Sequence, residues 1–432
     1  MRTLHVAAMP FPSVQGTQAA VAAMVRAEAR AGRGPELLTY AHGASAHGAS
    51  AHGASAAPHL AGAVHHRTAD LVRDRSLRSG PSLRKLVQDV QVALAVRRLA
   101  GRADALVAHH VEACAACLLS GASKPLLFFA HTALAPELPT YLPAELPGPW
   151  PTALRRGLAR ALSASGAALD RALLRRADGA AALSPDLRAA LEAQGDRPVT
   201  YVPVPWPVPA PIAPEERAAA RRELGLGEEP LLLYAGNLDA YQGLGTLLEG
   251  FARLRAIRKE ARLLVATASD PRALDEPLRR AGLGAAVTVT RLGGAEADRR
   301  RIHAAADLAV VPRRSPGGLP IKLLDALARG LPVVATRRAT AGLALEDVAA
   351  LAADDDPEAL ARAMLAGLAR APALREAATP YVRATHGDEA FRSALDAALR
   401  EARRRWSLGR RPPDRRPRRG GSACADDGAP PG

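Results

Sequence analysis

The sequence predicts an α/β protein of two doubly wound domains, each a parallel sheet covered by helices on both faces, with a ligand cleft between them. Its 432 residues are enough for two or three domains at about 100–200 residues per domain. Short apolar runs alternate with amphipathic stretches of helical period, a pattern typical of buried parallel strands. A proline-rich segment, PVPWPVPAPIAP, divides two halves that share this alternation, because proline removes backbone donors and fixes φ.

Residues 1–202 are expected to form the N-terminal domain. Apolar runs predict strands at Leu4–Ala8, Glu36–Tyr40, Ala105–Ala108, Pro125–Ala130, Gly179–Leu183 and Val199–Val204. Helical periodicity covers Thr17–Ala31, Ser82–Leu99 and Ala153–Arg176. The CxxC formed by Cys114 and Cys117 is expected on a helix, as a small-residue packing face, because no second pair completes a zinc site.

The N-terminal half contains one low-complexity insertion. AHGAS occurs three times in tandem at Ala41–Ser55. Ala, Gly, Ser and His cannot build a core, so residues 41–57 are predicted to be a flexible loop. Metal binding by the regularly spaced His42, His47 and His52 is the alternative.

The second half repeats the alternation after a linker at residues 203–214. Residues 215–386 are expected to form the C-terminal domain, with strands at Leu231–Ala235, Arg262–Thr267, Ala286–Thr290, Leu308–Val311 and Leu331–Thr336. Asp356 and Pro357 predict a helix start, as N-cap and first-turn proline. Residues 387–406 are expected to form a terminal helix that packs back on the N-terminal domain, and the basic, Pro/Gly-rich residues 407–432 to be disordered.

Charge and composition limit the class of protein. The formal net charge is +15, which suits phosphorylated substrates or an anionic membrane surface as well as nucleic acid. No apolar stretch is long enough to predict a membrane-spanning helix. Three cysteines exclude a disulfide framework, so the expected location is the cytoplasm. Peripheral contact with the inner face of the membrane is compatible with this location.

The strongest functional motif is PRRSPGGLPIKLLDALARGLPVVA at Pro312–Ala335. A strand, a loop with Gly317 and Gly318, and a helix expected from about Pro320 follow one another. The glycines allow a ligand to approach the backbone, and the helix start offers unpaired N–H groups and a positive dipole end to an anion.

Two charged residues follow on this helix. Lys322 and Asp325 are three residues apart, so they share one helix face. A cation beside a diphosphate and a carboxylate beside a ribose diol would bind a nucleotide sugar. An ordinary surface Lys–Asp pair is the alternative interpretation.

This segment resembles the donor-binding signature of the family-4 glycosyltransferases (glycosyl transferases group 1), retaining enzymes with the GT-B fold of two Rossmann-like domains. Five further stretches resemble motifs of the same group and occur in the same order: FPSVQGTQ, AHHVEA, FFAHTALAPELPTYL, YAGNLDAYQGL and DLAVVPR. The resemblance covers roughly residues 1–400, apart from the AHGAS repeat.

The resemblance implies a role for individual residues. His131, at the end of a predicted strand, and Lys322 are the expected catalytic residues; a buried, hydrogen-bonded histidine is the alternative for His131. Donor-binding residues are expected at Gly16, Gly236, Asn237, Gln242, Gly243, Arg313, Gly317, Gly318, Leu319, Lys322 and Asp325. Acceptor-side residues are expected at Gln15, His110 and Glu112; for Glu112, a carboxylate that stabilises a helix start is an equally good interpretation.

The sequence departs from the family pattern at four of these positions. Asp325 stands where the family has a ribose-binding Glu, and Gly317 stands where a first Glu contacts the donor sugar. Asn237 and Gln242 stand near an Arg and a Lys that bind the diphosphate in many members. Replacement of those cations by Arg313, Arg314 and Lys322 is expected, and weak donor binding is the alternative.

The expected function is therefore transfer of a sugar from a nucleoside-diphosphate-sugar to an acceptor hydroxyl with retention of configuration, in bacterial glycan or glycoconjugate synthesis. The acceptor is a glycan, a lipid-linked molecule or a small molecule. No cofactor, no metal and no specific nucleic acid are expected. The alternatives are a nucleotide-sugar epimerase of the same fold, a non-catalytic transferase-like binding protein, and RNA binding through the arginine-rich tail.

Overall fold

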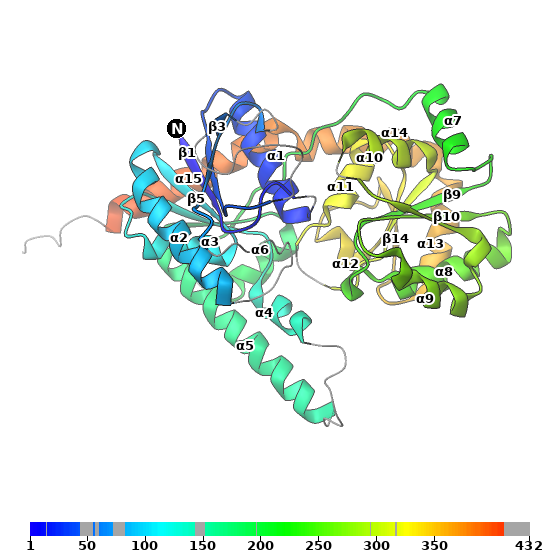
Figure 1. Ribbon diagram of the computed structural model, residues 1–432, viewed down its shortest axis with the longest axis horizontal. Helices are drawn as coiled ribbons and strands as arrows, with labels where there is room; N and C mark the ends of the chain where they lie inside the picture. Colours follow the sequence, from blue (N-terminus) through cyan, green and yellow to red (C-terminus); the bar gives the residue numbers. More distant parts are fainter. Residues whose placement is uncertain are drawn as a thin grey trace, which may run out of the picture.

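The computed structural model describes residues 1–13, 15–43, 55–56, 60–71, 83–142, 152–195, 197–293, 295–315 and 318–409. Two α/β lobes lie side by side (Figure 1), each built on its own sheet. Both sheets are parallel except for one antiparallel pair at the edge of the first, between β3 and β4. The predicted alternation of strands and helices is thus present in both halves of the chain.

The first sheet has eight strands in the order β3-β4-β2-β1-β5-β6-β7-β8. They are β1 (Thr3–Ala7), β2 (Glu36–Thr39), β3 (Ser55–Ala56), β4 (Val64–Arg67), β5 (Ala105–His109), β6 (Leu126–Ala130), β7 (Gly179–Ala182) and β8 (Thr200–Tyr201). The central strands β1, β5 and β6 are buried along their whole length, as continuous apolar strands in a covered parallel sheet should be.

The second sheet has six strands in the order β11-β10-β9-β12-β13-β14. They are β9 (Leu231–Ala235), β10 (Arg262–Thr267), β11 (Val287–Arg291), β12 (Leu308–Val311), β13 (Val333–Thr336) and β14 (Ala349–Ala352). The register of β12 against β13 pairs Val311 with Ala335, so these two strands end side by side at the edge where the signature turn begins.

Helices cover both sheets. In the first half they are α1 (Gly16–Arg30), α2 (Leu83–Leu99), α3 (His110–Leu119), α4 (Leu134–Glu137), α5 (Thr152–Arg176) and α6 (Pro185–Glu192). In the second half they are α7 (Pro214–Glu223), α8 (Leu244–Ile257), α9 (Asp275–Ala281), α10 (Glu296–Ala305), α11 (Ile321–Ala328), α12 (Arg337–Thr340), α13 (Pro357–Ala369), α14 (Ala371–His386) and α15 (Asp388–Gly409).

The chain returns to the first lobe at its C-terminal end. α15 packs against β6 and β7 (Figure 1), and a Cβ at Gly179 in β7 would lie 2.9 Å from the Cβ of Ala402. Ion pairs of Arg30 with Asp388 (2.7 Å) and of Arg33 with Asp396 (2.6 Å) join the end of α1 to the same helix. The helix runs to Gly409, beyond the predicted end at residue 406.

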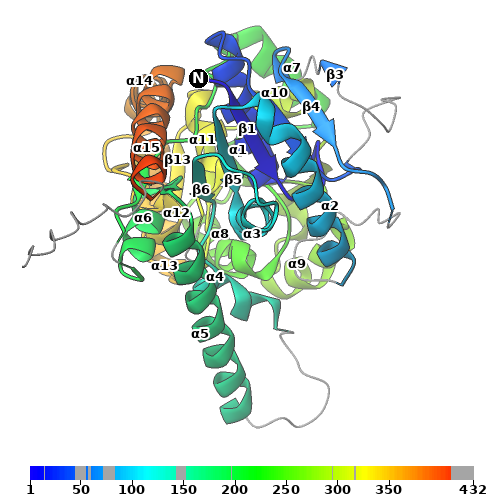
Figure 2. The ribbon, with the colours of Figure 1, turned by 90° about the vertical axis from the view of Figure 1, so that its left-hand side faces the viewer.

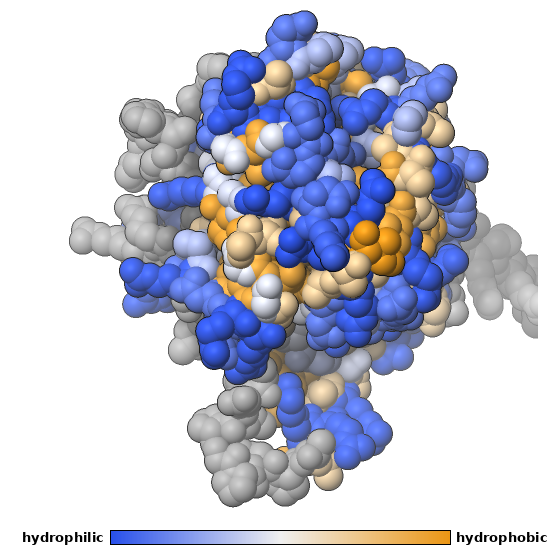
Figure 3. Space-filling model, turned by 90° about the vertical axis from the view of Figure 1, so that its right-hand side faces the viewer, coloured by the Kyte–Doolittle hydropathy of each residue, from blue (hydrophilic) through white to orange (hydrophobic). Residues whose placement is uncertain are grey.

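Each lobe has a distinct feature on its outside. α5 extends away from the first lobe, with its N-terminal end farthest from the sheet (Figure 2). The outer face of the second lobe is mostly hydrophilic, with apolar areas interrupted by hydrophilic side chains (Figure 3). None of the described helices is both long and apolar enough to cross a bilayer.

Several elements differ from the sequence-based expectation. The strand expected at Val199–Val204 is only two residues long, because Pro203 cannot donate to a ladder. β14, of sequence AALA, and β4, with two central histidines, were not predicted, since neither has the β-branched composition of a typical strand. Ser55–Ala56 forms β3 inside the predicted AHGAS loop; residues 44–54, 57–59 and 410–432 lie outside the described residues.

The CxxC motif lies wholly within the described residues, whereas most of the AHGAS repeat lies outside them. Cys114 and Cys117 lie on α3 as free, buried thiols, which confirms the packing interpretation, and burial raises the pKa of Cys114 to about 12. His42 is buried, whereas His47 and His52 lie outside the described residues. Among the described residues, no group of three or more His, Cys, Asp or Glu side chains could hold a metal ion.

Candidate active site at the domain boundary

The turn after β12 brings the backbone of the second domain against the first domain. Gly318 has a left-handed φ of +63°, and a Cβ at this position would lie 3.0 Å from the carbonyl oxygen of His131. Only glycine adopts this conformation without strain and permits so close an approach. Leu319 is buried beside it, and Gly317 lies outside the described residues.

The helix that follows starts at the same boundary. Pro320 is the N-cap of α11, so the helix begins one residue later than predicted, and no side chain caps it. Its first N–H groups and positive dipole end therefore have no side-chain acceptor among the described residues and suit an anion. Gly16 lies opposite: a Cβ there would lie 3.6 Å from Cγ1 of Ile321. Gln15, the N-cap of α1, precedes it, so the starts of the two helices face each other.

Lys322 is the half-buried cation of this helix start. Its Nζ lies 4.2 Å from the centroid of the Tyr234 ring and donates to Oε1 of Gln242 at 2.9 Å. Burial, together with the nearby Arg313 guanidinium, lowers the pKa of Lys322 to about 7. A Cβ at Gly236 would lie 2.5 Å from Nζ, so the glycine makes room for the ammonium group.

The loop after β9 holds this lysine through a series of amides. Gln242 donates from Nε2 to Oδ1 of Asn237 at 2.6 Å, and Asn237 donates from Nδ2 to the Asp239 carboxylate. Gly243 has a φ of +74°, and a Cβ there would lie 1.8 Å from the carbonyl oxygen of Pro312. The loop is thus packed against the signature turn, and any side chain at Gly243 would separate them.

Arg313 approaches the same space from the other side. Its guanidinium lies 5.6 Å from the Tyr241 ring centroid and donates to the carbonyl oxygens of Ser315 at 3.2 Å and Gly318 at 3.5 Å. Burial lowers the pKa of Arg313. Tyr241 in the same domain and Glu137 in the first domain oppose this shift. The site therefore has two partly desolvated cations, Lys322 and Arg313, beside one helix start.

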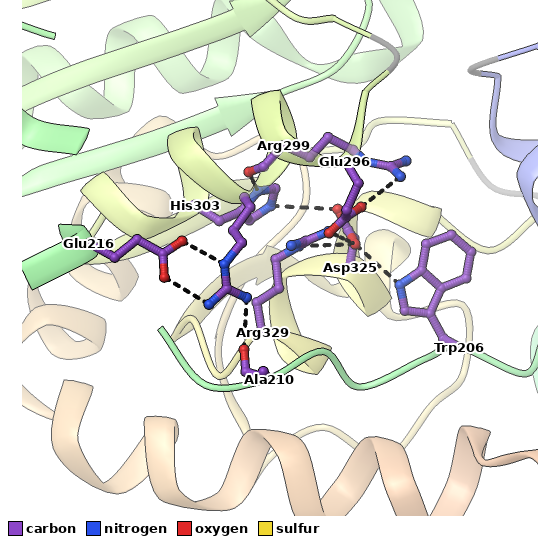
Figure 4. Close-up of polar contacts among 9 residues, drawn as sticks. Trp206, Ala210, Glu216, Glu296, Arg299, His303, Asp325 and Arg329 are labelled. Carbon is purple, nitrogen blue, oxygen red and sulfur yellow. Dashed lines mark hydrogen bonds and ion pairs between the residues drawn. The ribbon is translucent and has the colours of Figure 1, made fainter. Parts of the chain in front are cut away.

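Asp325 lies one turn further along α11 and is already hydrogen bonded (Figure 4). Its Oδ1 accepts from Nε1 of Trp206 at 3.3 Å and from Nε and Nη2 of Arg329 at 3.2 and 3.1 Å. Burial would raise the pKa of Asp325, but His303 and the arginines lower it. Oδ2 lies 3.8 Å from Nε2 of His303, which leaves one carboxylate oxygen for a further donor.

Sequence reasoning missed the partners of Asp325. Trp206 was assigned to the linker, although tryptophan is an unusual residue in a proline-rich spacer and its indole N–H needs an acceptor when buried. Arg329 also pairs with Glu296 of α10 at 2.7 Å, and its Nη1 is a buried nitrogen without a hydrogen-bond partner. The i, i+4 spacing of Asp325 and Arg329 was the available signal.

His131 of the first domain lies against the signature turn through its backbone carbonyl. It follows β6 and is 2% exposed. Its Nε2 lies 3.0 Å from Nδ1 of His109, and its Nδ1 is buried without a hydrogen-bond partner. Burial and the neighbouring His110 lower the pKa of His131 to about 3, so the ring is neutral at physiological pH.

His110 and Glu112 form a charged pair next to this histidine. His110 has a left-handed φ of +74°, which costs a non-glycine residue free energy and often marks a functional position. Its Nδ1 lies 3.1 Å from Glu112 and its Nε2 3.7 Å from Glu137. Burial alone would lower the pKa of His110, but Glu112, Glu137 and Asp170 together raise it to about 9.

The structure thus brings the expected residues to one boundary in three groups. Lys322, Arg313 and the uncapped start of α11 form a cationic group. Asp325 lies deeper, in a network with Trp206. The backbone carbonyl of His131 faces the turn from the first domain, and the charged pair of His110 and Glu112 lies beside this histidine.

Comparisons with known proteins agree with this architecture. Residues 229–370 match the family described as "Glycosyl transferases group 1". No curated protein matches the chain in sequence. The sucrose-phosphate synthase of Thermosynechococcus elongatus superposes with a TM-score of 0.71 at 19% identity, over 93% of this chain and 98% of that one.

Two further structures are similar over the same extent. Anabaena HepE in complex with UDP and glucose gives a TM-score of 0.69 at 15% identity, over 93% of this chain and 99% of that one. WaaG, a glycosyltransferase involved in lipopolysaccharide biosynthesis, gives 0.60 at 18% identity, over 92% of this chain and 98% of that one. The chain therefore has the predicted GT-B fold, and its second domain is similar to the group 1 glycosyl transferases.

Proposed function

We propose that this protein is a retaining glycosyltransferase that transfers a sugar from a nucleoside-diphosphate-sugar to an acceptor hydroxyl. One observation carries the proposal: Lys322, Arg313 and the uncapped start of α11 gather at the boundary where Gly318 meets His131. The match of residues 229–370 to the group 1 glycosyl transferases supports it. So does the UDP or UDP-glucose held by the similar Anabaena structures.

The cationic group would bind the diphosphate of the donor. Negative charge grows on the diphosphate as its bond to the sugar breaks. Preorganised cations and N–H donors in a desolvated site stabilise that charge. Binding an anion would also favour the protonated form of Lys322, whose pKa lies near 7 in the free protein. The same residues would therefore serve both donor binding and leaving-group departure.

Asp325 would bind the ribose. Its Oδ2 has no donor within hydrogen-bond distance among the described residues, whereas Trp206 and Arg329 fix Oδ1. A carboxylate held in one orientation accepts hydrogen bonds from a diol at little entropic cost. The network would thus compensate for the shorter acidic side chain at this position.

Retention would proceed by attack on the same face of the sugar, with the leaving phosphate taking the proton of the acceptor. We propose that no metal is required, because Lys322, Arg313 and α11 supply positive charge where the diphosphate would lie. Transfer that persists in EDTA would support this part of the proposal, and transfer restored only by added Mg²⁺ or Mn²⁺ would refute it.

Gln15, His110 and Glu112 would lie on the acceptor side. We place the reaction in the synthesis of a glycan or glycoconjugate, a role supported by the similarity to WaaG. We also propose a cytoplasmic protein that docks on an anionic inner membrane face, because its charge of +15 favours such a surface. Co-flotation with phosphatidylglycerol vesicles but not with phosphatidylcholine vesicles tests this contact.

A thermal-shift screen against UDP, GDP, ADP and dTDP tests donor binding first, because a ligand that binds only the native state raises Tm by mass action. The matching nucleotide sugar is then incubated with and without candidate acceptors, and the anomeric configuration of the product is read by NMR. Lys322→Ala should abolish the shift, and Lys259→Ala, an exposed lysine beyond α8, should retain it.

Each outcome separates the proposed function from its alternatives. A transferred sugar with retained configuration supports a retaining transferase. An inverted product refutes retention alone. Isomerised nucleotide sugar formed without acceptor identifies an epimerase, and no shift with any nucleotide favours a non-catalytic protein.

A further inference from the structure

A chain of four buried side chains runs through the first domain and ends at His131. Nε2 of His5 lies 2.6 Å from Oε1 of Glu28, and Nδ1 of His5 lies 2.8 Å from Nε2 of His109. Nδ1 of His109 then lies 3.0 Å from Nε2 of His131. The chain crosses three neighbouring strand positions, because β1, β5 and β6 are adjacent in the sheet.

This chain is isolated from solvent. Glu28 and His109 are 0% exposed, His5 is 1% exposed and His131 2%. Polar side chains in such a position destabilise a fold unless they are hydrogen bonded. Every ring nitrogen of His5 and His109 has a partner, and Thr3 donates to the second oxygen of Glu28 at 3.0 Å. The exception is Nδ1 of His131.

With Glu28 taken as a carboxylate and the three imidazoles as neutral, counting protons fixes the direction of the hydrogen bonds. Three imidazoles separate the carboxylate from the free nitrogen, and each neutral imidazole carries one N–H. The Glu28 carboxylate can only accept, so His5 donates to it from Nε2 and must accept at Nδ1. His109 therefore donates from Nε2 and accepts at Nδ1. His131 consequently donates from Nε2, and its Nδ1 carries a lone pair.

We propose that Glu28, His5 and His109 are positioning residues that hold His131 in the tautomer whose Nδ1 accepts a hydrogen bond from a hydroxyl of the donor sugar. The inference rests on the proposed function, because it names the orientation of a residue of that site. Without the chain, the two tautomers of His131 would be free to interchange, and the tautomer with N–H at Nδ1 would present a donor to the sugar instead.

The surroundings keep the rings of His109 and His131 neutral. Burial, His5 and His131 lower the pKa of His109 well below its usual range, and burial lowers the pKa of His131 to about 3. The charged groups that act on this region are His110 beside His131, with Glu112, Glu137 and Asp170 around it, and Arg33 beside Glu28. The cationic His110 beside His131 further disfavours a positive charge on the His131 ring.

The series of hydrogen bonds from His131 to Glu28 can take up one more proton. A proton bound at Nδ1 of His131 would reverse every hydrogen bond: His131 passes its Nε2 proton to His109, His109 passes its own to His5, and His5 passes its own to Glu28. The rings stay neutral and the carboxylate becomes a carboxylic acid. Glu28 thus determines whether Nδ1 of His131 is an acceptor or a donor.

NMR of the wild-type protein with ¹⁵N-labelled histidine tests the tautomer directly, because the ¹⁵N shift distinguishes a protonated from an unprotonated ring nitrogen. The His131 signals are assigned by their loss in His131→Gln. We expect Nδ1 unprotonated and Nε2 protonated at pH 7.5. A proton found on Nδ1 overturns the proposal, whether or not the protein transfers a sugar.

Glu28→Gln tests the connection. The amide keeps the size of the side chain, but it can either accept from Nε2 of His5 or, with its N–H₂ turned toward the ring, donate to it. The direction of the hydrogen bonds is then no longer fixed, so the His131 ring signals should change. Glu36→Gln is the matched control, because Glu36 lies 2.6 Å from His66 in another histidine–carboxylate pair of the same sheet. This variant should leave the His131 signals as in wild type. Unchanged His131 signals in a folded Glu28→Gln protein would refute the relay.

Kinetics separate positioning from simple structural support. Glu28→Gln should lower kcat by about ten- to a hundredfold, the range found for residues that orient a functional histidine, while the Kd of the donor nucleotide changes by less than about twofold. Loss of nucleotide binding together with kcat would mean a structural role and refute the proposal. If Glu28→Gln does not fold, the wild-type tautomer still decides. Failure of all nucleotides to bind wild-type protein would refute the proposed function and leave the tautomer measurement valid.

Discussion

Replacing Lys322 with methionine removes an ammonium group from a side chain that lies 4.2 Å from the Tyr234 ring centroid and donates to Gln242. Methionine retains most of the apolar stem. A hydrogen bond to a charged group contributes about 1.5–3 kcal/mol, which corresponds to about a ten- to hundredfold change in Kd. We therefore expect Lys322→Met to weaken binding of the nucleotide sugar that the screen identifies by about this factor at pH 6.5.

The same substitution changes the pH dependence of binding. The pKa of Lys322 lies near 7 in the free protein, and a bound diphosphate raises it. Above pH 7 the free lysine is neutral, so binding must take up a proton. Affinity should then fall as pH rises, by up to about tenfold per pH unit, and should be flat below pH 7. In Lys322→Met the slope should disappear.

Isothermal titration calorimetry between pH 6 and 9 measures both effects. That nucleotide sugar is the suitable ligand because its diphosphate diester has no group that titrates near pH 7, unlike the terminal phosphate of a nucleoside diphosphate. Two buffers of different ionisation enthalpy report the proton taken up on binding. Lys259→Met is the control and should keep the wild-type slope. Equal slopes in wild type and Lys322→Met would refute the assignment of Lys322 to the diphosphate.

Three further predictions address other parts of the site. Asp325→Asn should destabilise the fold by about 1–3 kcal/mol, because Arg329 loses a charged acceptor, and it should weaken nucleotide binding. Urea unfolding measures the loss of stability, and the thermal shift with nucleotide measures binding. A variant that binds nucleotide like wild type would contradict the assignment of Asp325 to the ribose. Gly318→Ala should lower the free energy of unfolding by about 1–2 kcal/mol because of the left-handed backbone at this position. It should also displace the turn from His131, so the rate of sugar transfer should fall sharply while Tm falls only slightly. A wild-type transfer rate would show that the close contact of Gly318 with His131 is not needed. His110 has a folded-state pKa of about 9, above its unfolded value, so its contribution to stability is complete below about pH 6.5 and is lost as pH rises through 9. The difference in free energy of unfolding between wild type and His110→Gln should therefore shrink between pH 6.5 and 9. A difference that stays constant over this range would contradict the prediction. Taking the difference cancels the opposite contribution of Lys322.

Much of the fold was predictable because the parallel strands are fully buried. Residues such as Leu126–Ala130 form continuous apolar runs, and their length and spacing distinguish them from helices. β14 was not predictable from composition, because AALA favours helix and becomes a strand only by pairing with β13. Pro380 similarly lies inside α14, where tertiary packing overrides its propensity to end a helix.

The candidate site was predictable to the extent that its residues stand in motifs. Gly318 and Lys322 follow a strand and open a helix, which is a recognisable order. Glu28 and His5 offered no such signal: one lies in an amphipathic helix and the other in an apolar strand, 23 residues apart. Their connection to His131 depends on the order of the strands in the sheet, which the sequence alone does not specify.

The amides at Asn237 and Gln242 have a physical reason once the surroundings of Lys322 are known. Cations at both positions would place two further positive charges beside an ammonium group whose pKa is already lowered by burial and Arg313. Like charges favour the neutral form, so Lys322 would lose its proton at a lower pH. The chain of amides instead orients a carbonyl oxygen toward Nζ and ends on the Asp239 carboxylate. It stabilises one protonated lysine without adding positive charge, and Arg313, the other cation of the site, comes from the loop after β12, the strand next to β9.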